Sequence, residues 1–189
     1  MTHMTEHTSL AELEAGLDHI RQAPPERGRV EMIVRRPAEN EREILETAEL
    51  SLEYGIVGDT WIDRPSSKTD DGGPHPEMQI TVMNARAAAL IAADREHWAL
   101  AGDQLYVDLD IGDANLPPGT RLQVGEATLE VSAHPHTGCR KFRDRFGDDA
   151  RRFVNSAAGR ELNLRGINTW VVEPGIVRLN DEVVKLPAG

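Results

Sequence analysis

The sequence predicts an α+β fold that is mainly β, a barrel-like arrangement of short strands with a few helices and an N-terminal helical extension. About seven short segments are predicted as strands, and the clearest of them alternate apolar and polar residues at period two, the spacing of half-buried strands. Two segments of helical composition interrupt them without regular β-α-β alternation. The length of 189 residues and the hydrophobic fraction of 39% are sufficient for the core of one domain.

Alternating apolar residues locate the predicted strands. The first covers residues 28–37, where Val30, Met32 and Val34 fall on one side of the chain. A Gly-Glu pair between two later segments is typical of a two-residue hairpin. The other predicted strands cover residues 79–84, 102–111, 121–125, 127–133 and two segments around the Pro174-Gly175 turn.

Two segments are predicted as helices. Residues 85–100 are alanine-rich and follow Asn84, a suitable N-cap. A second helix begins at Asp148 and ends at Gly159. For residues 38–50 two alternatives remain, a helix and an irregular edge segment, because the apolar stripe of this segment is thin. Residues 62–78 are polar and rich in Pro and Gly, which predicts a mobile loop.

Residues 1–28 are interpreted as an extension with a short helix, followed by the main domain at residues 29–189. Ser9 is a suitable N-cap for this helix, and Pro24-Pro25 ends it. We expect the helix to dock either on the body of the protein or on a second subunit, and the second case would make the protein a homodimer. Its apolar face consists of Leu10, Leu13, Leu17 and Ile20.

The expected location is the cytoplasm, with no membrane partner. No apolar run approaches the roughly 18 to 20 residues that span a bilayer, and the N-terminus lacks the features of a secretory signal. The single cysteine, Cys139, cannot form an internal disulfide, which fits a reducing compartment.

Charge argues against nucleic acid as a partner and favours a small anion. The net charge is -11, whereas binding to phosphate backbones relies on clustered Lys and Arg. Residues 39–63 contain eight carboxylates, but residues 140–152 contain six of the 21 basic residues against three acids. A local positive region in an acidic protein can attract a small phosphorylated ligand.

The residues around Cys139 leave several interpretations open. A lone cysteine can be a buried small hydrophobic residue. His134, His136 and Cys139 supply three zinc ligands, with His75 as a distant fourth. A nucleophilic cysteine with one of these histidines as its base is another alternative. Neighbouring basic residues favour the thiolate, and so a nucleophile or a soft metal ligand.

An ordered set of motifs runs along the chain. The motifs are "GIVGD" from Gly55, "QITVMNARAAAL", "GDQLYVDLDI", "PPGTRLQVGEATLEV", "HTGCRKF" around the cysteine, and the closing "RGI" and "PGIV". This set resembles the MOSC domain, the module named after the C-terminal part of molybdenum-cofactor sulfurases. The resemblance runs from Arg29 to Val184 and implies a fold related to the β-barrel domain of pyruvate kinase. The pair Asn180-Asp181 stands where the family often has Gly-Asp.

The resemblance implies that Cys139 is the functional residue, as a ligand of molybdenum in the molybdenum cofactor (molybdopterin) or as a sulfur acceptor. A soft thiolate suits a metal–sulfur centre, and basic side chains suit the terminal phosphate of the pterin. Two of the residues that the resemblance assigns to cofactor binding have a structural role as well: Asn84 is the expected helix cap, and Asp59 stabilises its glycine turn. The residues assigned to cofactor binding are His136, Thr137, Lys141, Arg165, Asn84, Arg86 and Asp59.

The expected protein is a stand-alone MOSC domain that binds the molybdenum cofactor. If it is an enzyme, the resemblance implies an oxidoreductase that reduces N-hydroxylated compounds with electrons from a separate redox partner. The alternative is a sulfur carrier or cofactor carrier without turnover. Pyridoxal phosphate would then belong to a separate cysteine desulfurase, because no such domain fits in this chain. A domain with a purely structural cysteine is the third interpretation.

Overall fold

Within residues 7–188, which the computed structural model describes, seven strands close into a barrel. Residues 1–6 of the predicted extension, and residue 189, lie outside the described residues. All neighbouring strands pair antiparallel except β5 and β6, which are parallel. The order around the barrel is β1 (Arg27–Arg35), β11 (Glu182–Lys185), β7 (Arg121–Val124), β8 (Ala127–Val131), β9 (Ile167–Glu173), β5 (Ile80–Asn84) and β6 (Leu105–Val107), which pairs with β1 again. The predicted mainly β barrel is confirmed.

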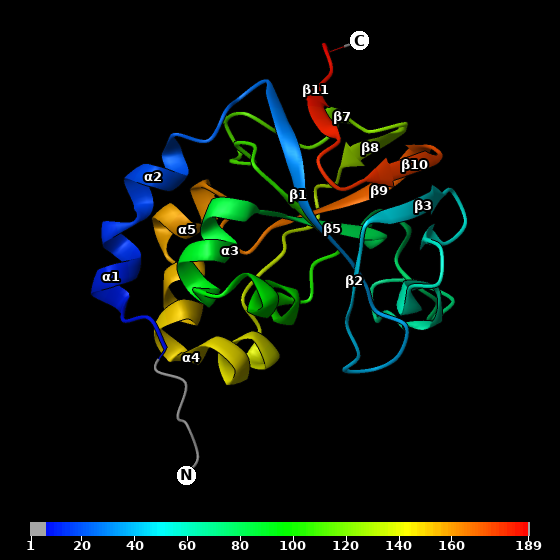
Figure 1. Ribbon diagram of the computed structural model, residues 1–189. Helices are drawn as coiled ribbons and strands as arrows, with labels where there is room; N and C mark the ends of the chain where they lie inside the picture. The colour runs from blue at the N-terminus through cyan, green and yellow to red at the C-terminus, as the bar shows by residue number, and fades with distance from the viewer. Residues whose placement is uncertain (1–6, 189) are drawn as a thin grey trace.

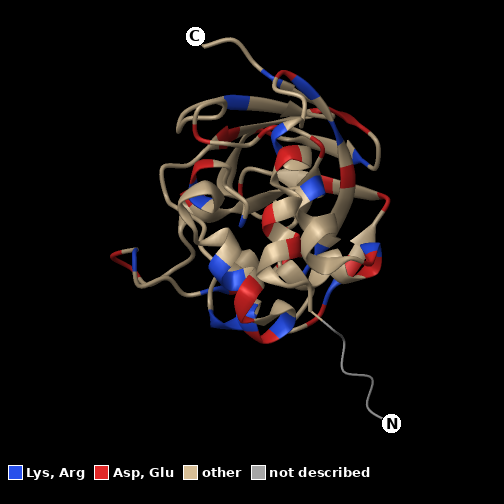
Figure 2. Ribbon diagram, turned by 90° about the vertical axis from the view of Figure 1, so that its left-hand side faces the viewer, with Lys and Arg blue, Asp and Glu red and all other residues tan. Residues whose placement is uncertain are grey.

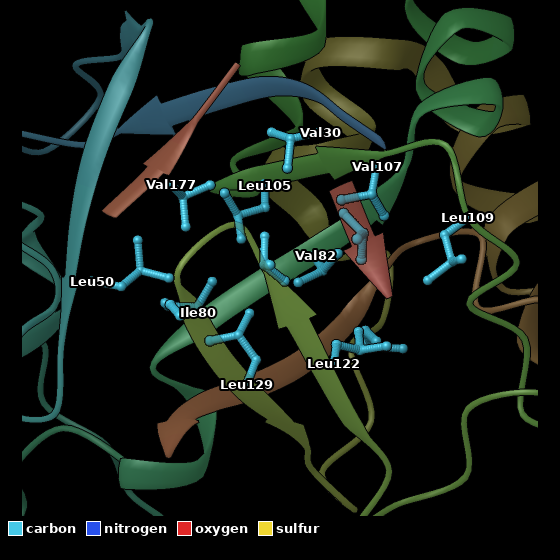
Figure 3. Packing of buried hydrophobic residues seen from close by; sticks show 14 of the residues in the cluster. Val30, Leu50, Ile80, Val82, Leu105, Val107, Leu109, Leu122, Leu129 and Val177 are labelled. Carbon is cyan, nitrogen blue, oxygen red and sulfur yellow. The ribbon is translucent and has the colours of Figure 1, made fainter. Parts of the chain in front are cut away.

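The barrel interior is one apolar core. Side chains from several strands, among them Val82, Leu105 and Leu122, point toward one another there (Figure 3). Leu109 and Ile111 also bury in this core, although β6 ends before them. The alternation in residues 102–111 therefore predicted the buried face correctly and overstated the length of the strand.

A β-bulge lets β1 contribute to two cores. The register of β1 against β6 shifts between Val30 and Met32, and an inserted residue reverses the side-chain direction that follows it. Val30 consequently faces the barrel interior, whereas Met32 and Val34 face the helices. The prediction that these three side chains share one side is wrong for this reason.

The helices gather on one side of the barrel and enclose a second core (Figure 1). Met83 and Tyr106 enter this core from β5 and β6, and Phe142 and Phe153 enter it from α4. In residues 7–188, no helix has both the length and the apolar character needed to cross a bilayer. The α-helices are α1 (Leu10–Ala15), α2 (Leu17–Arg21), α3 (Ala85–Ala92), α4 (Arg140–Val154) and α5 (Ala157–Glu161).

The N-terminal helices dock on the body of the same chain. Ser9 and Glu12 form a reciprocal capping box that starts α1. Leu13 is fully buried in the second core, and Ile20 buries there from α2. The division of the chain after residue 28 stays a prediction. Of the two predicted docking places, the body of the protein and a second subunit, the structure shows the first.

Residues 38–50 contain two short strands and no helix, so the helical alternative is wrong. Ala48 and Leu50 alternate with exposed residues and bury against the barrel core, which is a strand pattern. The strand β2 (Glu43–Leu45) pairs with β1, and β3 (Thr47–Ser51), β4 (Gly55–Ile56) and β10 (Gly175–Arg178) form a small second sheet.

The helix predicted for residues 85–100 ends after α3. Ala93 adopts a positive φ of 57°, and the chain continues as a 3-10 helix, η3 (Arg95–Ala101). This change of direction lets Trp98 bury in the second core. Gly102 then ends η3 with a φ of 93°, which only glycine adopts without strain.

The cysteine loop leads directly into α4, which starts at Arg140 rather than at the predicted Asp148. Gly147 interrupts this helix with a φ of 89° and kinks it. The following helix, α5, continues past the predicted end at Gly159. The early start of α4 places basic residues of the predicted loop on a helix.

The N-terminal helices are expected to contribute to the stability of the whole domain. Leu13→Ala removes a fully buried side chain and should lower the free energy of unfolding by about 2–5 kcal/mol. The exposed neighbour Glu14 is the control, since Glu14→Ala should change it by less than about 0.5 kcal/mol. Urea unfolding of both variants measures this. Equal, negligible effects would contradict the docking.

Candidate functional site

A pocket of about 700 Å³ lies beside the cysteine loop. It is formed where the β1–β2 connection, the segment at the 3-10 helix η1 (Thr60–Asp63), the end of η3 and the start of α4 meet. His75, ahead of the short helix η2 (Pro76–Met78), closes one side. Segments far apart in the sequence therefore build one site. The positively charged residues that line it are Arg36, Arg42, Arg64, Lys141, Arg145 and Arg165.

Cys139 lines this pocket and is exposed. Its loop is held by Gly138, whose N–H donates to Asn155 Oδ1 and whose carbonyl accepts from Asn155 Nδ2, both at 3.0 Å. A side chain at Gly138 would collide with Val154, since its Cβ would lie 2.7 Å from a methyl carbon. The glycine thus allows the loop to pack tightly on α4 directly before the thiol.

Three arginines converge on Gly102. Arg36 donates to the Gly102 carbonyl at 3.2 Å. A Cβ on Gly102 would lie 3.6 Å from Arg42 Nη2 and 3.7 Å from Arg145 Nη1. Within the described residues, neither Arg42 nor Arg145 forms an ion pair with a carboxylate. The pocket therefore holds guanidinium groups whose charge is not neutralised by the protein.

Burial and mutual repulsion lower the pKa of two pocket arginines. Burial lowers the pKa of Arg42, and the charges of Arg145 and Arg36 lower it further. Partial burial followed by the charge of Arg36 lowers the pKa of Arg64 to about 10. Both groups stay protonated at neutral pH, and solvent screens part of this repulsion at the exposed Arg64. An anion in the pocket would relieve the repulsion.

Asp59 holds Arg36, one of the pocket residues, in a buried ion pair. The carboxylate is completely buried and accepts from Arg36 Nη2 at 2.6 Å and from Arg36 Nε at 2.9 Å. Burial alone would raise the pKa of Asp59, but the hydrogen bonds and charge of Arg36 and two backbone N–H groups hold it below its usual value. Asp59 therefore fixes the arginine and does not itself line the pocket.

A second buried ion pair joins Arg165 to Asp103 beneath the cysteine loop. Arg165 also donates to the Ala101 carbonyl at 2.7 Å, and its guanidinium lies 5.0 Å from the centre of the Phe142 ring. His136 Nδ1 lies 3.4 Å from the other oxygen of Asp103. The pair therefore contacts residues on both sides of Cys139, which positions the loop.

Several buried polar atoms near the pocket have no hydrogen-bond partner among the described residues. They include Arg42 Nε, Arg165 Nε and Asn168 Oδ1, and all three residues line the pocket. An unpaired buried polar atom costs about 1–3 kcal/mol, so native proteins rarely leave one unpaired without a ligand or water. These atoms have almost no exposed surface, so the fold around the pocket bears this cost.

The structure brings together four of the residues predicted from the sequence. Cys139, His136, Lys141 and Arg165 all line the pocket. Lys141 is exposed and lies 3.5 Å from Glu39, an ion pair at the pocket mouth.

The other predicted residues lie outside the pocket lining. Asn84 caps α3 through bonds to two backbone N–H groups. Arg86 pairs with Asp108 at 2.7 Å and donates to the His19 carbonyl, near the N-terminal helices. Thr137 is exposed within the cysteine loop without lining the pocket.

Two of the alternative interpretations of Cys139 fit the structure poorly, whereas the nucleophilic cysteine stays a prediction. Cys139 is exposed, so it is not a buried hydrophobic residue. Within residues 7–188, no group of three His, Cys, Asp or Glu side chains is arranged to hold a metal ion, which contradicts the zinc interpretation. The ring of His134 packs on His75 and faces Glu77, whereas His136 faces Asp103. The extended backbone turns the two histidines in different directions.

Sequence reasoning missed most of the pocket arginines. Arg36, Arg42 and Arg64 flank or interrupt the acidic stretch 39–63, so its net charge concealed them. In the basic run 140–152, Lys141 and Arg145 line the pocket, while others pair with acids on α4, where basic and acidic positions interleave (Figure 2). The consecutive Arg35-Arg36 before Pro37 was the signal that could have drawn attention to this end of β1.

The chain belongs to the MOSC domain family. A sequence model of the MOSC domain matches residues 72–184, more than half of the chain. The structure is similar to the YUAD protein from Bacillus subtilis, with a TM-score of 0.62 at 15% identity over 86% of this chain and 97% of that one. It is also similar to YiiM from Escherichia coli, with a TM-score of 0.55 at 19% identity over 85% and 71%. No curated protein matches the sequence.

At these identities the structural likeness concerns the fold alone. The family match begins after the strands β1 to β4, so the arginines at residues 36, 42 and 64 lie outside the matched region. The predicted resemblance to the MOSC domain is confirmed.

The buried pair below the pocket should be costly to break. Asp59→Asn leaves Arg36 buried without a counter-charge and should lower the free energy of unfolding by about 3–5 kcal/mol at pH 7. The pKa of Asp59 is lowered in the folded state, so its contribution is present above about pH 4 and is lost as the pH falls through the lowered value. The difference between wild type and variant should therefore shrink in acid.

The exposed pair of Arg35 and Glu43, at 2.6 Å, provides the matched control. Glu43→Gln should cost no more than about 1 kcal/mol. Urea unfolding at several pH values measures both variants. A difference for Asp59→Asn that stays constant below pH 4 would contradict the assigned titration.

Proposed function

We propose that this protein binds the molybdenum cofactor, with Cys139 as a ligand of molybdenum and the pocket arginines as ligands of the cofactor phosphate. The single observation that carries the proposal is one pocket that contains both an exposed thiol and a cluster of guanidinium groups without carboxylate partners. A soft sulfur ligand and a phosphate site are what a phosphorylated pterin with a dithiolene-held metal requires. Membership of the MOSC domain family supports the same group.

The residues present fit this group in charge and chemistry. Arg42, Arg145 and Arg64 would hold the phosphate, because guanidinium groups bind phosphate through paired hydrogen bonds. Arg165 and Asn168, which also line the pocket, would face the pterin. The thiol of Cys139 supplies the soft donor.

The proposed activity is the reduction of N-hydroxylated compounds. The overall step is R–NH–OH plus two electrons and two protons, giving R–NH2 and H2O: the N–O bond breaks and the nitrogen is reduced. When bound, the molybdenum cofactor supplies a redox-active metal that passes the two electrons from an external donor. The chain's own residues bind the phosphate, hold the cysteine loop through Arg165 and Asp103, and orient the substrate in the pocket.

Cofactor loading should depend on the thiol. After anaerobic incubation with molybdenum cofactor, wild type should retain near-stoichiometric molybdenum and pterin, whereas Cys139→Ser should lose most of the molybdenum. Lys68→Ala, in an exposed segment outside the pocket lining, is the control and should load like wild type. Metal analysis and pterin fluorescence measure both. Equal molybdenum in wild type and Cys139→Ser would contradict a thiolate ligand.

The arginine cluster should bind phosphate before any cofactor is loaded. Arg42→Ala and Arg145→Ala should each raise the Kd for inorganic phosphate about ten-fold, since each removes a charge-assisted hydrogen bond. Arg143→Ala is matched to Arg145, because Arg143 lies on the same helix and pairs with Asp144 instead of lining the pocket. Titration calorimetry at low salt measures all three. Similar Kd values for all variants would contradict a phosphate site.

The exposure of Cys139 favours a second candidate function, that of a sulfur acceptor. A persulfide on a separate pyridoxal-phosphate desulfurase would transfer its outer sulfur to the Cys139 thiol, leaving a thiol on the desulfurase and a persulfide on Cys139. Mass spectrometry after incubation with a desulfurase and cysteine detects the added sulfur atom. Turnover of an N-hydroxylated compound with reduced methyl viologen as electron donor separates the two functions, because a carrier gives none.

A further inference from the structure

The ring of His136 lies between the pocket and the completely buried carboxylate of Asp103. His136 lines the pocket with a side chain that is 18% exposed, while its Nδ1 atom is buried and lies 3.4 Å from Asp103 Oδ1. Among the described residues, neither of these two atoms forms a hydrogen bond, so the 3.4 Å contact is the nearest approach of two unpaired buried polar atoms. The other oxygen of Asp103 is taken by Arg165. Asp103 Oδ1 is therefore the unpaired acceptor that Nδ1 faces, and a small rotation of the ring would complete a hydrogen bond between them.

The backbone of Gly166 leaves the space between these atoms free. Gly166 has a φ of 105°, and a Cβ there would lie 3.0 Å from Asp103 Oδ1 and 3.3 Å from His136 Nδ1. It would also lie 2.7 Å from the Val82 carbonyl oxygen. No other residue fits this position without displacing the histidine or the carboxylate.

When one ring nitrogen of a neutral histidine donates its hydrogen to a carboxylate, the other ring nitrogen can only accept a hydrogen bond. A neutral imidazole with hydrogen on Nδ1 has an unprotonated Nε2, which accepts hydrogen bonds and donates none. Nδ1 is turned away from the pocket, so Nε2 is the ring nitrogen left for a ligand. The positively charged lining residues are all donors, so Nε2 adds an uncharged acceptor beside them.

The electrostatics of the site agree with a neutral ring. Burial is the main cause that lowers the pKa of His136 to about 3, and the charges of Arg165 and Arg36 act in the same direction. Asp103 opposes them, but its charge is shared with Arg165. The imidazole is therefore neutral throughout the physiological pH range.

We propose that His136 Nε2 is the hydrogen-bond acceptor that recognises the O–H group of an N-hydroxylated substrate, and that Asp103 is the positioning residue that fixes the ring for this task. The proposal rests on the proposed reductase function and adds to it a substrate-recognising residue. It selects compounds with a free N–OH group over their O-alkylated analogues, because an ether oxygen has no hydrogen to donate. His136 orients the substrate and is not the source of the protons that the reduction consumes.

The first test concerns the ring itself and needs no cofactor. Long-range proton–nitrogen NMR of uniformly labelled protein distinguishes the two neutral tautomers from imidazolium, with His136→Gln used to assign the signals. At pH 7 we expect hydrogen on Nδ1 and an unprotonated Nε2. Hydrogen on Nε2, or a charged ring at pH 7, would overturn the proposal.

The second test compares two isosteric replacements in the loaded protein. Glutamine can place a carbonyl oxygen near the position of Nε2, whereas asparagine ends near Nδ1 and leaves the pocket without that acceptor. Phenylhydroxylamine and its O-methyl ether are the probes. For wild type and His136→Gln we expect a preference of about ten-fold in binding for phenylhydroxylamine, which His136→Asn loses, while kcat for phenylhydroxylamine changes less than its KM. Equal preferences in the Gln and Asn variants would overturn the proposal.

Failure of this inference and failure of the proposed function are distinguishable. Wild-type protein that takes up no molybdenum would remove the reductase function, while the NMR experiment would still decide the state of His136. Conversely, full molybdenum loading with the wrong tautomer would retain the cofactor site and remove the role of His136. Molybdenum content is therefore measured for every variant in the second test.

Discussion

The buried ion pair between Arg165 and Asp103 is the contact on which the site depends. Asp103 precedes β6 and Arg165 precedes β9, two strands that both pair with β5, so the barrel holds the charges at a fixed distance. His136 contacts the carboxylate and Phe142 contacts the guanidinium, three residues before and three residues after Cys139. Because residues on both sides of Cys139 contact one rigid pair, the loop holds the thiol at the pocket, although the thiol forms no hydrogen bond within residues 7–188.

Buried acidic residues support the basic residues that line the pocket. Asp59 and Asp103 are buried and each pairs with one arginine, which makes it feasible to keep Arg36 and Arg165 out of water. Arg42 and Arg145 lie near these pairs, and each donates to a backbone carbonyl, but among the described residues neither pairs with a carboxylate. A protein with a net charge of -11 can in this way carry a strongly positive pocket, and the surrounding acidic surface disfavours large polyanions while a small anion can enter.

The two cores explain how the segments of the pocket meet. The barrel core fixes β5, β6 and β9, and the bulge in β1 turns Met32 and Val34 toward the helices that carry the cysteine loop. The small sheet of β3, β4 and β10 lies beside the barrel and brings the residues after β4 back toward the end of β1. There the Thr60 N–H donates to the Arg36 carbonyl at 2.9 Å, and Asp59 reaches the arginine. The site is a consequence of this packing and is not encoded in any one segment.

The sequence by itself determined the mainly β fold, the family resemblance, the caps at Ser9 and Asn84, and Cys139 as the residue of interest, because these depend on local periodicity, capping chemistry and ordered motifs. Tertiary structure alone decided which charges share the pocket. Arg36 and Arg42 stand next to an acidic stretch, and only the closure of the barrel carries them to Arg145 on α4. It also decided the length of α3, the bulge in β1, and the contact of His136 with Asp103. These features result from long-range packing and burial, for which a single sequence carries no periodic signal.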